Sequence, residues 1–318
     1  MKLGFYTNYT AGIAKFAQEI GFRSMELSAW PQSSLDADIT TDERIAAIKG
    51  DLAQRDIEVS ALGYYPNFLA ADDAEAKEYR RYFRQVLRLA NRMDVHTVCT
   101  FAGQTPGLAV EDCLPRFAVI FKGFCDEAEE LGVRIAIENC PMLNHKTRAG
   151  ENLAFSPEIW EAMFDAVPSS ALGLEIDPSH LVFLGIDYVQ AILEFGPRIL
   201  HVHAKDLDID ERRRGRLGFY GQAFGKLEGF GNGWWRFRAP GWGEIDWRRL
   251  ITALVDVGYD GNIDIEHEDE VFAAAALAKI GGEADIVDIL GHEPNALVLG
   301  YNHLAPLMPA HEPGLLPD

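Results

Sequence analysis

The sequence predicts one α/β domain built as a (β/α)8 TIM barrel, and three observations lead to this prediction. Short apolar segments alternate with longer amphipathic segments along the 318 residues. Eight strand-plus-helix units can be counted, and eight parallel strands close into a barrel. No linker rich in Gly, Pro or Ser and no change of composition divides the chain. We therefore expect a single domain over residues 1–318.

Eight segments are predicted to be the barrel strands, because they are short, apolar and rich in β-branched or aromatic residues. In chain order they span residues 2–6, 23–29, 57–65, 96–103, 133–139, 172–177, 199–206 and 262–269. Amphipathic helices are predicted between them, for example over residues 13–21, 76–93 and 112–132. Several of these helices end in Gly or Asn just before the next strand, as helix C-termini do.

Two connections are longer than ordinary loops, and both are expected at the mouth of the barrel. One spans residues 207–243 after the seventh strand, and the other spans residues 270–296 after the eighth. Connections that follow a barrel strand lie at the C-terminal face, where active sites of this fold are built. The first connection is rich in aromatic residues, which is unusual for a disordered segment. We expect it to form part of a pocket wall or a subunit contact.

Composition excludes some classes of partner. Formal net charge is −20, from 29 Lys and Arg against 49 Asp and Glu, and such a surface repels nucleic-acid phosphates and anionic membranes. No apolar run is long enough to cross a bilayer, and the first residues lack the features of a secretory signal. The four cysteines are scattered, with no CxxC pair, so reduced thiols and a cytoplasmic location are expected. We expect a small-molecule substrate, with no nucleic-acid or membrane partner.

Metal-ligand residue types recur where four consecutive predicted strands end. These residues are Glu138, Asp177, His203 and Glu266 on the fifth to eighth strands. Neighbouring strands lie about 5 Å apart, so such side chains can converge on one ion. Each of them alone is more often a capping, turn or structural residue. Together, buried acids without a cation would repel one another and become protonated, which favours a divalent-metal site with oxygen and nitrogen ligands.

Five ordered motifs identify a resemblance to a known family. They are Glu138-Asn139, Asp177-Pro178-Ser179-His180, His201-Val202-His203-Ala204-Lys205-Asp206, the stretch from Pro240 to Trp247 (PGWGEIDW), and the stretch from Ile265 to Asp269 (IEHED). The chain resembles the xylose isomerase-like TIM barrels, a group of sugar isomerases and epimerases within the AP endonuclease family 2 superfamily, over residues 1 to about 269. The insertion after Asp269 is longer than expected for this family.

The resemblance implies a role for each of these residues. One divalent ion would be held by Glu138, Asp177, His203 and Glu266, with Mn first and Mg, Co or Zn as alternatives. Glu138 and Glu266 would also be the catalytic acid and base. His201, one step deeper in the strand, would orient the ligands as a second-shell residue. Substrate-binding roles are expected for His180, Lys205, Arg238 and Tyr65. Tyr6, Trp30 and Tyr64 could complete an aromatic wall, although ordinary packing explains them equally well. A homodimer or homotetramer is plausible from the family.

The implied activity is divalent-metal-dependent sugar isomerisation or epimerisation, by proton abstraction next to a carbonyl through a metal-stabilised enediolate. A keto-sugar or inosose dehydratase or lyase is the alternative on the same site, because expulsion of a β-hydroxyl can follow the same deprotonation. No phosphate-binding glycine motif is visible, which favours an unphosphorylated sugar or polyol. A nuclease of the endonuclease IV type would need further His ligands at early strand ends, where Tyr64, Tyr65 and Phe101 stand. A non-catalytic sugar-binding barrel is the remaining alternative.

Overall fold

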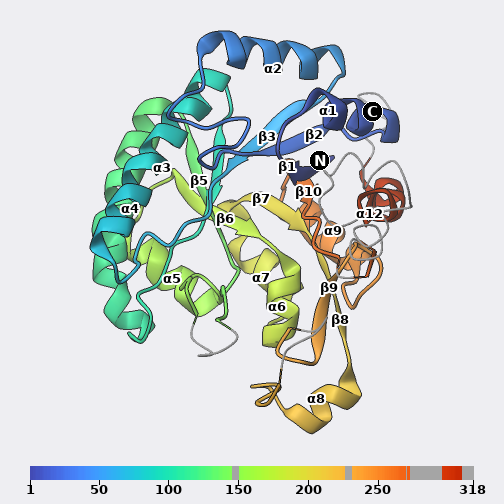
Figure 1. Cartoon of the computed structure of the whole chain (residues 1–318). Helices are drawn as coiled ribbons and strands as arrows, with labels where there is room; N and C mark the ends of the chain where they lie inside the picture. The colour runs from blue at the N-terminus through green and yellow to red at the C-terminus, as the bar shows by residue number, and fades with distance from the viewer. Residues whose placement is uncertain (145–149, 226–230, 270, 273–295, 310–318) are drawn as a thin grey trace.

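The eight barrel strands pair in parallel and close on themselves, which confirms the predicted (β/α)8 barrel (Figure 1). A computed structural model describes residues 1–144, 150–225, 231–269, 271–272 and 296–309. The barrel strands are β1 (Lys2–Thr7), β2 (Ser24–Ser28), β3 (Glu58–Gly63), β4 (Thr97–Thr100), β5 (Arg134–Glu138), β6 (Leu172–Ile176), β7 (Ile199–Ala204) and β10 (Asn262–Ile265). The last strand, β10, pairs with both β1 and β7 and so closes the sheet.

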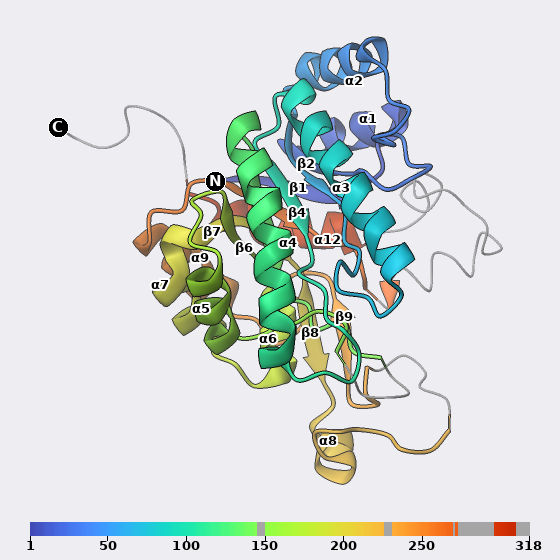
Figure 2. The same cartoon turned by 90° about the vertical axis from the view of Figure 1, so that its left-hand side faces the viewer.

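Helices surround the barrel on its outer side (Figures 1 and 2). They are α1 (Ala11–Ile20), α2 (Asp42–Gln54), α3 (Asp73–Met93), α4 (Val110–Leu131), α5 (Pro157–Ala166), α6 (Pro178–Leu184), α7 (Tyr188–Phe195), α9 (Trp247–Asp256) and α12 (Ala296–Leu304). Capping chemistry sets their ends. Asp72 accepts hydrogen bonds from the backbone N–H groups of Ala74 and Glu75 at the start of α3, and Gly132 ends α4 at a φ of 67°. Among the described residues, no helix combines the length and the apolar character needed to span a bilayer.

The apolar core lies between the strands and the helices, and the interior of the barrel is separate from it. Along β5, Ile135 and Ile137 join the core, while Ala136 packs with Ala61 and Cys99 inside the barrel. This alternation follows from the period of two along a strand. Small residues at the interior positions leave room there for polar side chains.

An arm follows β7 where the sequence predicts a long connection. It consists of β8 (Asp206–Ile209), α8 (Glu211–Leu217) and β9 (Trp235–Arg238), and β8 and β9 pair antiparallel. The arm projects from the barrel with α8 at its tip (Figure 1). β7 therefore ends at Ala204, before the predicted end at residue 206. Asp206 accepts hydrogen bonds from Trp247 Nε1 and from the backbone of Gly241 and Ile245, and these hold the chain where it leaves the barrel. The predicted insertion at 270–296 lies almost wholly outside the described residues.

Candidate active site

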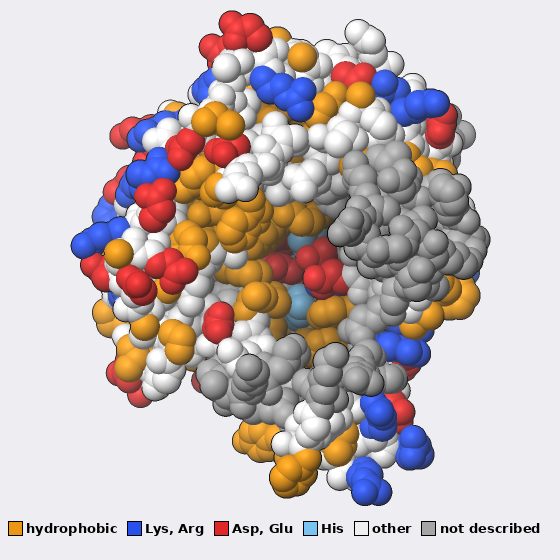
Figure 3. Space-filling view, in the orientation of Figure 1, with side chains coloured by type: hydrophobic (Ala, Val, Ile, Leu, Met, Phe, Trp, Pro, Cys, Tyr) orange, Lys and Arg blue, Asp and Glu red, His pale blue; other side chains and the backbone are white. Residues whose placement is uncertain are grey.

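The C-terminal mouth of the barrel holds a cavity of about 290 Å³. In Figure 3, acidic and His side chains gather at the floor of a central hollow, and apolar side chains surround it. Its ionic end is lined by Glu138, His180, Lys205, Glu266 and Glu268, and its apolar end includes Phe101, Met142, Phe183, Trp235 and Phe237. A larger hollow, of about 780 Å³, lies where β1, β3 and β10 begin, but none of the four predicted metal ligands lines it. The chemistry is therefore expected in the smaller cavity.

The four predicted ligands come from four neighbouring strands. Glu138 and Glu266 line the cavity, and Asp177 and His203 lie beside its ionic end. Glu138 is the last residue of β5, Asp177 follows β6, His203 lies on β7 and Glu266 follows β10. His203 Nδ1 is 3.5 Å from Glu138 Oε1 and 3.6 Å from Glu266 Oε2. His180, in the first turn of α6, places Nε2 3.5 Å from both Glu138 Oε1 and Asp177 Oδ2. We call Glu138, Asp177, His180, His203 and Glu266 the mouth group.

Five buried atoms of the mouth group have no hydrogen-bond partner among the described residues. They are Glu138 Oε1, Asp177 Oδ2, both ring nitrogens of His180, and His203 Nδ1. A buried polar atom without a hydrogen bond costs about 1–3 kcal/mol, so several that face one another indicate a missing ligand. Carboxylate oxygens and imidazole nitrogens suit Mn, Mg, Co or Zn.

Geometry gives three possible ligand sets for a metal ion among the described residues. One consists of Glu26, Cys99, Glu175 and His201 inside the barrel, and the other two share Glu138 at the mouth. Glu138, Asp177, His180 and Glu266 can each offer an atom within 4.8 Å of the others, and Glu138 and His203 do so together with Glu175. The donor atoms therefore fit a divalent ion at the mouth, and His180 is a candidate ligand beside the predicted four.

Lys205 and His180 are the only basic residues among the described residues that line the cavity. The Lys205 ammonium is 3.1 Å from Asp177 Oδ2 and 3.0 Å from Glu268 Oε2, and it also contacts Glu266. Burial alone would lower the pKa of Lys205, but Asp177 and Glu266 hold it well above its usual value. Lys205 therefore stays charged and balances these carboxylates.

The two predicted acid/base residues have opposite pKa tendencies. Burial raises the pKa of Glu266 to about 8, and the negative charge of Glu268 adds to this effect. Burial acts in the same direction on Glu138, but the nearby imidazole rings of His180 and His203 outweigh it and hold the pKa of Glu138 well below its usual value. Without a bound ion, the two carboxyl groups therefore differ in how readily each gives up its proton.

The arm supplies an aromatic wall to the cavity. Trp235 stacks on Phe183 of α6, with ring centroids 4.5 Å apart and an interplanar angle of 8°. Phe237 meets the His180 ring edge-on at 5.5 Å and lies 4.4 Å from the Lys205 ammonium. Aromatic residues of the segment 207–243 thus form part of the pocket wall.

His201, Tyr65 and Arg238, like Asp177 and His203, are not among the residues that line this cavity. His201 is deeper in the barrel, with Nδ1 3.0 Å from Glu175 Oε1. Tyr65 directs its hydroxyl group to Glu175 and to another buried acid, Glu26, at 3.0 and 2.6 Å. Arg238 is bound by Asp269, with Nε 3.0 Å from Oδ2. Substrate contacts by Tyr65 and Arg238 stay predictions.

The early aromatic residues divide between the core and the rim. Tyr64 is buried and packs against Trp30 and Tyr82, so it belongs to the core. Tyr6 lies near the ring of His203, with centroids 6.3 Å apart, and also lines another hollow at the same rim.

Sequence reasoning missed three buried acids inside the barrel: Glu26 on β2, Glu175 on β6 and Asp264 on β10. Glu175 stands two residues before Asp177, and Asp264 two residues before Glu266, so each pair shares a strand face. The same alternation that placed His201 below His203 would have indicated both acids.

Comparison with known sequences establishes the family. Residues 14–286 match the sequence model of the family described as "Xylose isomerase-like TIM barrel". The chain therefore belongs to the xylose isomerase-like TIM barrel family.

Individual relatives include a protein of undescribed activity and enzymes of two classes. The chain is 24% identical over 320 residues to "Uncharacterized protein YfiH" of Bacillus subtilis (strain 168), covering 89% of this chain and 98% of that protein. It is 29% identical over 163 residues to "Inosose dehydratase" of Lacticaseibacillus casei, covering 50% of this chain and 49% of that protein. A crystal structure of D-psicose 3-epimerase in the presence of D-fructose superposes with a TM-score of 0.65 at 19% identity, covering 96% of this chain and 99% of that one. The last likeness shows the shared fold.

Proposed function

We propose that this protein is a divalent-metal-dependent sugar isomerase or epimerase, with its active site at the mouth group. The observation that carries the proposal is the set of buried ligand atoms without a hydrogen bond on Glu138, Asp177 and His203, which face one another beside Glu266. Membership in the xylose isomerase-like family and the likeness to a ketose epimerase agree with it.

The proposed ligands are Glu138, Asp177, His203 and Glu266, with Mn as the first candidate ion. When bound, such an ion supplies Lewis-acid stabilisation of the negative charge that develops when a carbon next to a carbonyl loses a proton. The ligand backbones are fixed at the ends of their strands. Asp177 is held further, because its Oδ1 accepts hydrogen bonds from the Ser179 backbone N–H at 2.8 Å and from its hydroxyl group at 2.6 Å. This leaves Oδ2 directed to the site.

Glu138 and Glu266 are the proposed proton acceptor and donor. They approach the cavity from β5 and β10, and β6 and β7 lie between them in the barrel. Carboxyl groups on two sides of a bound sugar can remove a proton from one face and return one to the other.

The charges that line the cavity favour an uncharged substrate. Glu138, Glu151, Glu266 and Glu268 line it, and the Lys205 ammonium is already shared among three carboxylates. A phosphate group would meet net negative charge there. We therefore propose an unphosphorylated keto-sugar or polyol derivative, whose apolar ring face would lie against Trp235 and Phe237.

Dehydration of an inosose or keto-sugar is the second candidate activity, favoured by the similarity to inosose dehydratase over half of the chain. The same Glu138–Glu266 pair would remove the proton, and a β-hydroxyl group would leave as water. His180 or Lys205, both at the ionic end of the cavity, could protonate the leaving oxygen.

Incubation of the Mn-loaded protein with a panel of keto-sugars and inososes in D2O separates these activities. Deuterium at a carbon next to the carbonyl, with the number of oxygens unchanged, supports isomerisation or epimerisation. An unsaturated or dehydrated product that forms with loss of water supports the dehydratase. No exchange and no product with any member of the panel contradicts both. The Glu138→Gln variant is the control for exchange that does not depend on this site.

A further inference from the structure

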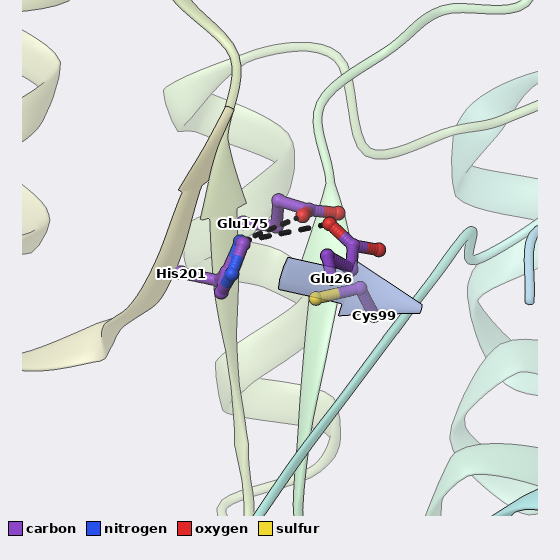
Figure 4. A group of neighbouring side chains, drawn as sticks. All are labelled: Glu26, Cys99, Glu175 and His201. Carbon is purple, nitrogen blue, oxygen red and sulfur yellow. Dashed lines mark hydrogen bonds and ion pairs between the residues drawn. The ribbon is translucent and has the colours of Figure 1, made fainter. Parts of the chain in front are cut away.

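A second group of ionisable side chains lies inside the barrel, beneath the mouth group. We call Glu26, Glu175, His201 and Asp264 the interior group, and Figure 4 shows three of them together with Cys99. The interior of a TIM barrel is ordinarily filled with branched apolar side chains. Placing carboxylates there carries a desolvation cost that only specific contacts can offset.

Two of these carboxylates contact His203 from below. His203 Nε2 lies 2.7 Å from Glu26 Oε2 and 3.1 Å from Glu175 Oε1. An ionised carboxylate can only accept a hydrogen bond, so the imidazole nitrogen between the two must carry the hydrogen. Nδ1 then faces Glu138 and Glu266 with its lone pair available for a metal ion.

Further contacts hold the two carboxylates in place. The Tyr65 hydroxyl group lies between them, 2.6 Å from Glu26 Oε1 and 3.0 Å from Glu175 Oε2. His201 lies beside Glu175, as Figure 4 shows, with Nδ1 3.0 Å from Oε1. His201 Nε2 is in turn 3.0 Å from Asp264 Oδ2.

Two backbone features make room for Glu26 and Glu175: bulges in the strands that carry them, and a glycine on the neighbouring strand. Strand pairing shifts register at Met25/Glu26 and again at Leu174/Glu175, and such bulges redirect a side chain. Gly63 on β3 leaves the space that the Glu26 carboxylate occupies, because a Cβ atom there would collide with Glu26 Oε1. These features make the placement of both acids a property of the fold.

We propose that Glu26 and Glu175 are positioning residues, which fix the Nε2–H tautomer and the orientation of His203 and so raise the affinity of the mouth group for a divalent ion. This inference rests on the proposed metal site. The interior group is a support, not a second metal site, because Glu26, Glu175 and His201 already have hydrogen-bond partners in the described structure. Hydrogen bonds from outside the first ligand shell typically change metal affinity 10- to 100-fold.

Side-chain ¹⁵N NMR of the wild-type protein tests the orientation directly. In the Zn²⁺-loaded protein we expect His203 to show a protonated Nε2 and a metal-bound Nδ1, with the Nε2–H protected from exchange with water. A spectrum in which Nδ1 carries the hydrogen and Nε2 is the free or metal-bound nitrogen would overturn the proposal. Because it needs no variant in the interior group, this test stands even if such variants fail to fold.

Metal titration of variants tests the effect on affinity. We expect Glu26→Leu and the double variant Glu26→Gln/Glu175→Gln to bind Mn²⁺ about 10- to 100-fold more weakly than the wild type. Gly63→Ala should also weaken binding, because it displaces Glu26 without removing it. Asp36→Asn is the matched control, since Asp36 is a buried acid that bonds to Tyr82 outside the barrel interior, and its affinity should not change. Saturating Mn²⁺ should restore kcat in the Gly63→Ala variant, which a merely misfolded site would not allow.

The outcomes separate this inference from the proposed function. Wild-type affinity in folded Glu26 and Glu175 variants would overturn the positioning role and leave the metal-dependent activity standing. A wild-type protein that binds no divalent ion would contradict the proposed function, and with it any effect of Glu26 and Glu175 on affinity.

Discussion

The mouth group and the interior group both consist of Glu, Asp and His side chains, and both draw on β6, β7 and β10 or the residues that follow these strands. They differ in how their polar atoms are satisfied. In the mouth group, Glu138 Oε1, Asp177 Oδ2 and His203 Nδ1 have no hydrogen-bond partner among the described residues. In the interior group, Glu175 and His201 are bonded to each other and to neighbours on both sides. Burial alone therefore does not identify a ligand site. The unpartnered atoms distinguish the layer that binds from the layer that supports it.

The largest effect is expected from removing an acid of the mouth group. Glu138→Gln and Glu266→Gln should each lower kcat by about 10³-fold or more, because each loses a proton-transfer group and a ligand. Glu151→Gln is the control, since Glu151 lines the cavity outside the mouth group and should change kcat far less. Steady-state kinetics with circular dichroism of the same samples measures both activity and folding. Near-wild-type kcat in either mouth-group variant would contradict the assigned roles.

Removing Asp264, an acid of the interior group, should mainly affect stability. Asp264 accepts hydrogen bonds from Ser24 and Ser60 and contacts His201. The Asp264→Ala variant therefore removes a buried polar partner from each of these three side chains. We expect the free energy of unfolding in urea to fall by about 3–5 kcal/mol. Asp260→Ala, at an exposed position near the start of β10, should stay within about 0.5 kcal/mol of the wild type. A loss after Asp264→Ala no larger than that after Asp260→Ala would contradict the structural role assigned to Asp264.

The interior group also makes stability depend on pH. Burial alone would lower the pKa of His201, but hydrogen bonds with Asp264 and Glu175 raise it to about 10. A pKa above the unfolded value near 6.5 contributes stability that is present below about pH 6.5 and is lost as pH rises towards 10. Metal-free protein should therefore lose free energy of unfolding between pH 7 and 10. His201→Gln should weaken this dependence, and exposed His96→Gln should retain it. A slope unchanged by His201→Gln contradicts the assignment.

The smallest expected effect concerns cysteine reactivity. All four cysteines are free thiols; three are buried, while Cys140 lines the cavity at the mouth. Iodoacetamide should modify Cys140 first, at a slow rate because burial raises the pKa of its thiol. Mass spectrometry of tryptic peptides measures the order of labelling. Labelling of Cys113 or Cys125 before Cys140 in folded protein would contradict the described accessibility.

Fold and mouth-group residues were accessible from the sequence because both depend on local, periodic features. Apolar segments of strand length predicted the barrel. Acids and imidazoles at the strand ends predicted Glu138, Asp177, His203 and Glu266 as candidate ligands. For the arm, the sequence predicted only a long connection. The pairing of β8 with β9 joins residues far apart in that segment, so local sequence patterns do not indicate it.

The interior group was less accessible, for a physical reason. A single Glu within an apolar strand is ordinarily read as an exposed residue, and the bulges at Glu26 and Glu175 are a property of strand pairing that no single strand reveals. His180 as a candidate ligand also depended on the structure, because its approach to Glu138 is set by the start of α6.

Anomalous diffraction at the Mn absorption edge, from crystals grown with Mn²⁺, tests the central claim most directly. We expect one strong peak per chain, within bonding distance of Glu138, Asp177, His203 and Glu266. A map with no peak at the mouth, or with the ion bound only elsewhere in the molecule, would contradict the proposed metal centre.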